Sequence, residues 1–183
     1  MRRGAGFTLI ELMMTLAVVA VVLAISVPDM RGLVADRAIR ADAEAFQAAL
    51  RLARHEAMRL GEVVSLCARD AAQGDTTHIC LADGRSWDGG WLVFVDRGRR
   101  GVIEPEDRVV LVHQPVQASS VIQATTGRLS FQPTGISFSA ASSFRFVPAD
   151  AAFDDEQAMR FALLVCVNKA GRSRVSERAD RCA

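Results

Sequence analysis

The sequence predicts an α+β protein in which one long N-terminal helix packs on an antiparallel β-sheet or sandwich head. Two observations predict this class. An apolar run, Phe7–Val27, is followed by helical periodicity that continues to Leu60. After Gly61 the pattern changes to short apolar bursts separated by turn residues, which is typical of strands. The head is therefore expected over residues 62–183.

The apolar run carries a single ionisable side chain, Glu11. At about 1.5 Å per residue, a helix over residues 7–27 reaches roughly 30 Å, the hydrocarbon thickness of a bilayer. A charge inside such a segment costs about 2.5–3.5 kcal/mol on insertion scales, so this carboxylate indicates a functional site. An ordinary secretory signal cut after Ala24-Ile25-Ser26 and a plain signal anchor are the alternatives, and both leave Glu11 unexplained.

Residues 28–61 are expected to continue the helix into the head, with Pro28 ending the apolar run and Gly61 at the C-terminal cap position. Apolar residues recur there at steps of three and four, and they are Ile39, Ala43, Phe46, Leu50, Ala53, Ala57 and Leu60. The residues that fall mostly off this stripe are expected in solvent, and they are Arg37, Arg40, Glu44, Gln47, Arg51, Arg54 and His55.

Alternating or short apolar segments predict the strands of the head. They are Val63–Ala68, Thr76–Leu81, Trp91–Val95, Arg108–His113, Val121–Ala124, Leu129–Gln132, Ile136–Ser139, Phe144–Val147 and Phe161–Val167. One helical turn is expected near Asp154–Gln157. The strand Trp91–Val95 is expected to be buried on both faces. The loop Arg97-Gly98-Arg99-Arg100-Gly101 that follows it is expected to be a solvated turn, with contact to a phosphate backbone as the alternative.

Four cysteines follow the apolar run, and in an exported domain an even number predicts disulfides. Of the three possible connectivities, Cys67–Cys80 and Cys166–Cys182 are favoured because each closes a short polar loop beside an apolar strand. A zinc site is the alternative, but no C-x-x-C or H-x-x-x-H spacing is present. The histidines are scattered, and no nucleophile elbow or phosphate-binding loop appears, so no catalytic, metal or cofactor site is expected.

Positive charge gathers at the C-terminus, although the net charge of the whole chain is only +1. From residue 160 to residue 183 there are six basic and two acidic residues. In Gly171-Arg172-Ser173-Arg174 the two arginines alternate, so both project from the same side of an extended chain. Planar guanidinium groups suit a polyanion backbone. A charged tail without a partner is the alternative, and an acidic loop at Asp150, Asp154, Asp155 and Glu156 could cancel its field.

The opening of the chain, Gly6-Phe7-Thr8-Leu9-Ile10-Glu11, resembles the signal of type IV pilins and type II secretion pseudopilins. The resemblance implies that prepilin peptidase cuts after Gly6, removing residues 1–6, and that the new terminal residue, Phe7, is N-methylated. It also implies that Glu11 neutralises the terminal amine of a neighbouring subunit during assembly. The partners would then be other major or minor pilins or pseudopilins. The expected location is a single pass through the inner membrane with a periplasmic head.

Within that group the chain resembles the FimT/GspH family. The markers are Val64-Ser65-Leu66-Cys67, Cys80, Trp87-Asp88-Gly89-Gly90-Trp91-Leu92-Val93-Phe94-Val95-Asp96, Gly101, Phe131, Gly135, Gly171-Arg172-Ser173-Arg174 and Cys182. In the FimT branch the Gly-Arg-x-Arg motif is associated with DNA binding during natural transformation. The resemblance implies double-stranded DNA contacts at Arg172 and Arg174, with Lys169 and Arg178 as helpers. A structural pseudopilin of type II secretion and an anchored periplasmic β-domain that never polymerises are the alternatives.

Overall fold

The computed structural model describes residues 8–73, 78–82, 84–114, 120–139, 141–149, 154–177 and 181–182, with the backbone alone for residues 24–31 and 73. Chain packing divides into two compact units, Met1–Ala35 and Asp36–Ala183. Gly6 and Phe7, the predicted processing residues, lie outside the described residues, as does Arg178.

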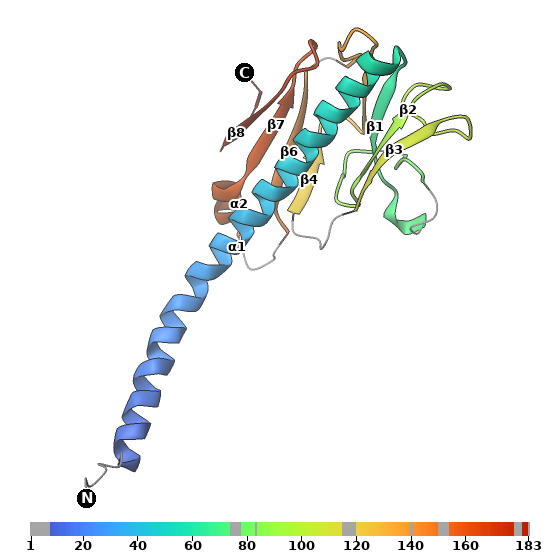
Figure 1. Cartoon of the computed structure of the whole chain (residues 1–183). Helices are drawn as coiled ribbons and strands as arrows, with labels where there is room; N and C mark the ends of the chain where they lie inside the picture. Colours follow the sequence, from blue (N-terminus) through green and yellow to red (C-terminus); the bar gives the residue numbers. More distant parts are fainter. Residues whose placement is uncertain are drawn as a thin grey trace, which may run out of the picture. The chain divides into compact units, whose positions relative to one another are not determined.

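Helix α1, Leu9–Leu60, runs through both units (Figure 1). Its last backbone bond joins the Gly61 amide to the Ala57 carbonyl at 3.0 Å, and Gly61 has a φ of 68°, a conformation that glycine adopts without a steric penalty. Gly61 therefore caps the helix as the sequence predicts. The helix does not stop at Pro28, and its backbone continues as helix across that residue.

In the first unit, the apolar side chains of α1 are exposed on every side of the helix. The exposed large apolar residues are Leu9, Ile10, Leu12, Met13, Met14, Leu16, Val18, Val19, Val21, Val22, Leu23, Leu33 and Val34. Within the part of the chain that the structure describes, no helix is both long and apolar enough to cross a membrane.

The second unit holds two four-stranded antiparallel sheets. The first sheet has the order β3-β2-β1-β5 and the second has the order β4-β6-β7-β8. The strands are β1 (Val64–Ala68), β2 (Trp91–Val95), β3 (Arg108–His113), β4 (Ser120–Ala124), β5 (Arg128–Phe131), β6 (Ser142–Pro148), β7 (Leu163–Val167) and β8 (Ser173–Glu177). A short 3-10 turn, η1 (Ala71–Gln73), follows β1, and a short helix, α2 (Asp155–Phe161), precedes β7.

The core lies between the head part of α1 and the inner faces of both sheets (Figure 1). The predicted apolar stripe of α1 is buried there, from Ile39 to Ala57, with Leu60 half-buried. Phe46 is at its centre, where its ring lies 4.6–5.8 Å from the rings of Trp87, Trp91, Phe144 and Phe146. Because aromatic rings from both sheets meet one helix residue, α1 fixes the two sheets in one head.

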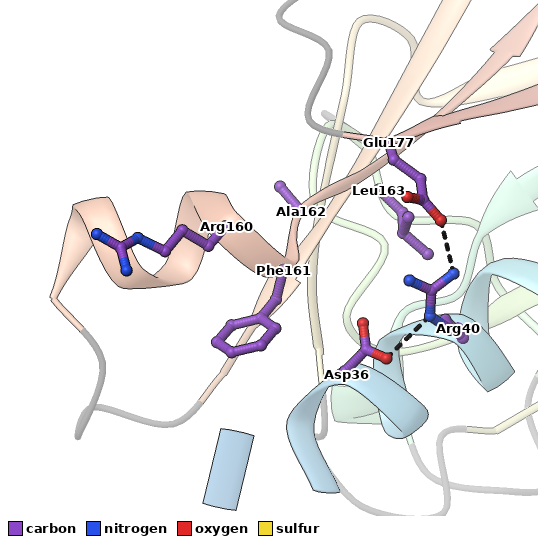
Figure 2. Close-up of a pocket in the computed structure, with 7 residues that line it drawn as sticks. All are labelled: Asp36, Arg40, Arg160, Phe161, Ala162, Leu163 and Glu177. Carbon is purple, nitrogen blue, oxygen red and sulfur yellow. Dashed lines mark hydrogen bonds and ion pairs between the residues drawn. The ribbon is translucent and has the colours of Figure 1, made fainter. Parts of the chain in front are cut away.

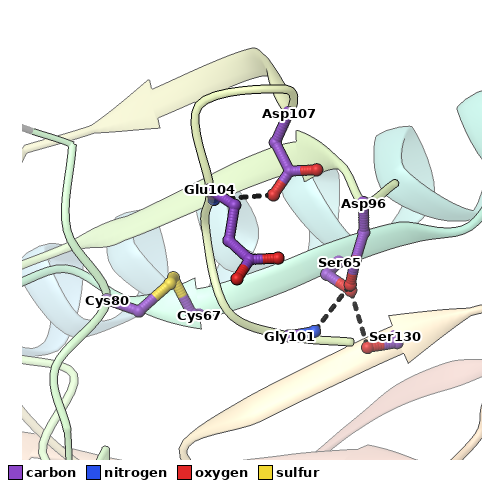
Figure 3. Close-up of a disulfide and its surroundings, with 8 residues drawn as sticks. All are labelled: Ser65, Cys67, Cys80, Asp96, Gly101, Glu104, Asp107 and Ser130. Atoms are coloured by element: carbon purple, nitrogen blue, oxygen red, sulfur yellow. Dashed lines mark hydrogen bonds between the residues drawn. A yellow bond between two sulfur atoms is a disulfide. The ribbon is translucent and has the colours of Figure 1, made fainter. Parts of the chain in front are cut away.

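Strand β2 is buried on both faces, as its unbroken apolar sequence predicts. Trp91, Val93 and Val95 face the core, whereas Leu92 and Phe94 pack in a second cluster with Cys67. Just after β2, the buried carboxylate of Asp96 accepts bonds from the Ser65 hydroxyl and from the Gly101 amide (Figure 3). Asp96 therefore orders the loop that leads to β3.

Three strand predictions need correction. The predicted strand Ile136–Ser139 forms only a single bridge, between Ser137 and Phe131. The Phe138 amide bonds to the Ser130 carbonyl of the first sheet, whereas the Ser137 amide bonds to the Lys169 carbonyl beside the second sheet. The segment therefore divides its backbone bonds between two sheets and cannot form a ladder with either.

The second correction concerns Thr76–Leu81, of which residues 78–81 are described. Cys80 forms an isolated bridge with Arg69 and no strand forms around it. The third concerns Phe161, which ends α2 rather than beginning β7. Asp154 caps α2 with a capping box to Gln157, so the expected helical turn extends to a full short helix.

The four cysteines pair as the sequence favours. Cys67 in β1 bonds to Cys80, and Cys166 in β7 bonds to Cys182 beyond β8. The first disulfide is packed in the second apolar cluster, beside the loop that follows β2 (Figure 3). The second ties the end of the chain to the outer face of the second sheet. No cysteine is free.

Candidate nucleic-acid interface

The β7–β8 turn carries the first of the two predicted DNA-binding arginines. The Asn168 amide bonds to the Arg172 carbonyl, and the Arg172 amide bonds to the Asn168 side-chain oxygen, both at 3.0 Å. Gly171 has a φ of 74°, and a Cβ placed there would lie 2.2 Å from the Gly135 carbonyl oxygen. Only glycine fits this position, because the turn lies directly against the neighbouring backbone.

Arg172 and Arg174 line one shallow hollow of about 430 Å³ on the second sheet. Arg174 is paired in register with Cys166, so their side chains share the face that points away from the core. The floor of the hollow includes Cys166 and Cys182, and both arginines are exposed. No acidic residue is among the described residues that line it. The structure therefore brings the two arginines together, on one face, over the second disulfide.

Lys169 is exposed on the same turn but does not line the hollow. The predicted acidic loop is described only from Asp154 onward, with Asp150 outside the described residues. In the described part, Asp154 caps α2 and Glu156 forms an ion pair with Arg160 of the same helix at 3.0 Å. Two of the three described carboxylates, Asp154 and Glu156, are therefore engaged by α2 and its cap.

Arg54 is a residue that the periodicity assigned to solvent and that the structure places beside the turn. Its guanidinium Nε donates to the Gly135 carbonyl at 3.0 Å, and the side chain is half-buried. A Cβ on Gly171 would come within 3.3 Å of the same Nε. Arg54 therefore ties the Gly135 turn to α1 and lies beside the β7–β8 turn. No sequence pattern predicts this contact, because it joins residues that are 81 positions apart.

Two of the three arginines in the loop after β2 are neutralised by glutamates. Arg97 forms an ion pair with Glu62 at 2.7 Å, and Arg99 forms one with Glu104 at 2.8 Å. The pKa of Glu62 lies below its ordinary value because the Arg97 side chain donates to it. The pKa of Glu104 is lowered by hydrogen bonds from the Arg99 amide and side chain. These pairs engage two of the three arginines of the loop, which favours the solvated-turn prediction for Arg97 and Arg99.

A smaller cavity of about 240 Å³ lies where α1 meets β8 and the end of α2 (Figure 2). Arg40 of α1 donates to Asp36 at 2.9 Å and to Glu177 of β8 at 2.7 Å. The pKa of Arg40 is raised, first by the hydrogen bond that it donates to Asp36 and then by the one that it donates to Glu177. This network ties the end of strand β8 to the helix, so the strand that carries Arg174 is fixed at both ends.

Glu11, the predicted assembly residue, lies in the first turn of α1 and is exposed. Its amide bonds to the Thr8 hydroxyl at 3.3 Å, so Thr8 caps the helix. In the part of the chain that the structure describes, no group of three or more His, Cys, Asp or Glu residues could hold a metal ion.

This combination of an N-terminal helix with an apolar first half and a two-sheet head is that of the type IV pilin class. The prokaryotic N-terminal methylation motif matches residues 1–27. The profile of the family described as Type II transport protein GspH matches residues 42–171, so the chain belongs to this family. It is a type IV minor pilin or pseudopilin.

Two crystal structures of the type IV minor pilin FimU of Pseudomonas aeruginosa (strain PAO1) share the fold. The first is 17% identical with a TM-score of 0.56, and the match covers 76% of this chain and 89% of FimU. The second crystal form gives 16% identity and a TM-score of 0.52, and the match covers 76% of this chain and 93% of FimU. At these identities the likeness shows the fold alone. No curated protein sequence matches the chain significantly.

Proposed function

We propose that this chain is a minor pilin of a type IV pilus, inserted in the inner membrane by residues 7–27 and cut after Gly6 by prepilin peptidase. Support comes from the methylation motif over residues 1–27 and from the first half of α1. Apolar side chains exposed on every side of a helix must be covered by lipid or by other helices. Lipid covers them before assembly, and the helices of neighbouring pilins cover them afterwards.

Glu11 is proposed to pair with the amino terminus of the neighbouring subunit, which offsets the cost of a carboxylate among apolar groups. Glu11→Ala is expected to abolish incorporation into pili while the precursor is still processed. Mass spectrometry should find an N-methylated Phe7 in both proteins. Glu44→Ala, an exposed glutamate in the head part of α1, is the matched control and should assemble normally. A native chain that begins at Val27 would contradict the proposal.

We further propose that the head binds double-stranded DNA through its phosphate backbone during uptake. The observation that carries this is the hollow that Arg172 and Arg174 both line, with both side chains exposed on one face of the second sheet. Guanidinium groups on a fixed hairpin suit phosphate contact, which gives affinity and strong salt dependence but no base reading. Lys169 and Arg178 are proposed as helpers.

The test is the affinity of the full-length chain, in detergent, for duplex DNA over a series of salt concentrations. Arg172→Ala with Arg174→Ala should weaken binding and reduce the slope of log K against log salt by about 1.8, because each phosphate contact contributes about 0.9. Arg97→Ala with Arg99→Ala removes the same charge from the neutralised loop and should leave both quantities unchanged. Equal effects of the two double variants would contradict the assignment.

A second candidate function is that of a minor pseudopilin in type II secretion, which the match to the Type II transport protein GspH profile favours. In that case the chain is a structural subunit and the arginines need no polyanion. Deletion would then retain exported proteins in the periplasm and leave pili intact. Loss of pili with normal secretion would instead support the first proposal.

A further inference from the structure

A second basic surface lies beside the β7–β8 turn and contains an exposed aromatic ring. Arg100, in the loop after β2, lies over the ring of Phe138 with its guanidinium carbon 3.7 Å from the ring centre. Phe138 remains 37% exposed. Arg128 of β5 completes the group, because its aliphatic stem lies against Gly101, where an added Cβ would come within 2.6 Å of it. We call Arg100, Arg128 and Phe138 the stacking patch.

The stacking patch differs from its surroundings in charge. Its two loop neighbours, Arg97 and Arg99, are paired with glutamates, as described above. Among the described residues, no carboxylate lies within ion-pair distance of Arg100 or Arg128. The fold therefore neutralises two arginines of this loop and leaves the third on an aromatic ring.

The stacking patch is continuous with the β7–β8 turn through the backbone. Phe138 follows Ser137, whose amide donates to the Lys169 carbonyl at 3.0 Å. Two residues before Ser137, the Gly135 carbonyl lies against Gly171. These contacts place the segment that carries Phe138 directly beside the turn that carries Arg172.

We propose that the stacking patch holds unpaired bases of the DNA whose phosphates the turn contacts, so that the chain prefers DNA with a single-stranded segment. This inference rests on the proposed DNA binding. A base has a π-face that stacks on a guanidinium plane or on an aromatic ring, and such stacking requires no particular sequence. Arg128 supplies a phosphate contact beside the stacked base.

The test uses the full-length chain in detergent with two probes, a short single-stranded oligonucleotide containing 2-aminopurine and the blunt duplex of the same sequence. Phe138→Leu keeps an apolar side chain but removes the ring. It should lower the affinity for the single strand about fivefold or more and abolish the quenching of 2-aminopurine, with duplex affinity unchanged. Ile136→Ala, a change at a neighbouring residue that is 41% exposed, is the control and should alter neither.

Thermal unfolding checks that each variant is folded. If Phe138→Leu is not, Arg100→Gln gives the same test from an exposed side chain. Equal single-strand affinity and quenching in Phe138→Leu and Ile136→Ala would overturn the inference. A different result would contradict the proposed DNA binding itself: unchanged affinity for both probes in Arg172→Ala with Arg174→Ala. If that double variant loses binding while Phe138→Leu binds both probes normally, the phosphate contact at the turn is supported and the stacking patch is refuted.

Discussion

Two arginine-rich turns of the head differ in what surrounds them. In the loop after β2, Glu62 and Glu104 reach Arg97 and Arg99 from positions outside the arginine run. In the β7–β8 turn, Arg172 and Lys169 have no carboxylate within ion-pair distance among the described residues. The loop is richer in arginine than the turn, yet two of its three arginines are already paired with glutamates. The density of arginine along a chain is therefore a poor guide to a polyanion site, because acids outside the arginine run decide which guanidiniums are available.

The largest expected effect comes from the two disulfides, one beside each turn. Closing a loop of about 15 residues stabilises a fold by about 3 kcal/mol, and the separations here are 13 and 16 residues. Replacing either pair by alanine should lower the Tm by about 6–12 °C for a chain of this size. Only Cys166→Ala with Cys182→Ala should also weaken DNA binding, since that disulfide forms the floor of the hollow.

Differential scanning calorimetry and the duplex affinity measurement check this pair of variants. Cys67→Ala with Cys80→Ala is the matched control, because its disulfide is buried in the second apolar cluster. If both variants weaken DNA binding by the same factor, the loss reflects general instability and the hollow has no special role.

An intermediate effect on DNA binding is expected when the glutamate partners of the loop arginines are removed. Glu62→Gln with Glu104→Gln removes the partners of Arg97 and Arg99 and should make the loop resemble the turn. The salt slope for duplex DNA should steepen by up to about 1.8, one contact for each released guanidinium. Glu44→Gln changes the charge at an exposed site of α1 and should leave the slope unchanged. An unaltered slope in the double variant would show that Arg97 and Arg99 do not reach the phosphates of the bound DNA even without their glutamate partners.

The smallest effect concerns pH. Arg97 and Arg99 hold the pKa values of Glu62 and Glu104 below the ordinary 4.5. A carboxyl whose pKa is lower in the folded state stabilises the fold above its unfolded pKa and loses this contribution as the pH falls through its folded pKa. The loop should therefore stay neutralised between pH 7 and pH 5. Carboxyl carbon NMR titration should give midpoints below 4.5 for both residues, and a midpoint at or above 4.5 would contradict the ion pairs.

Much of the fold could be predicted from the sequence because its signals are local. The stripe from Ile39 to Ala57 and the apolar strand Trp91–Val95 each repeat with the period of their structure, and both are buried. Ile136–Ser139 has the same alternation, but its amides bond to both sheets, which no local pattern can reveal. β8 was expected only as an extended arm, because its polar sequence lacks the apolar alternation of a strand with one buried face.

Part of the candidate site could also be predicted, because some of its residues are close together in the sequence. Arg172 and Arg174 alternate along the chain, so their common face follows from strand geometry. Arg54, Arg100 and Phe138 come from three separate segments, and only the folded chain brings them near the turn. The sequence did not predict the ion pair between Arg97 and Glu62 either, since the two residues are 35 positions apart.

The tight approach of Gly171 to the Gly135 carbonyl has a consequence for the kinetics of capture. The Ser137 amide and the Asn168 side chain hold this hairpin, and Arg54 fixes the Gly135 turn against which Gly171 packs. An arriving polyanion therefore meets a surface whose conformation is already fixed. Little chain entropy is then lost on association. The rate of encounter would depend mainly on long-range attraction between opposite charges, and ionic strength would govern it directly.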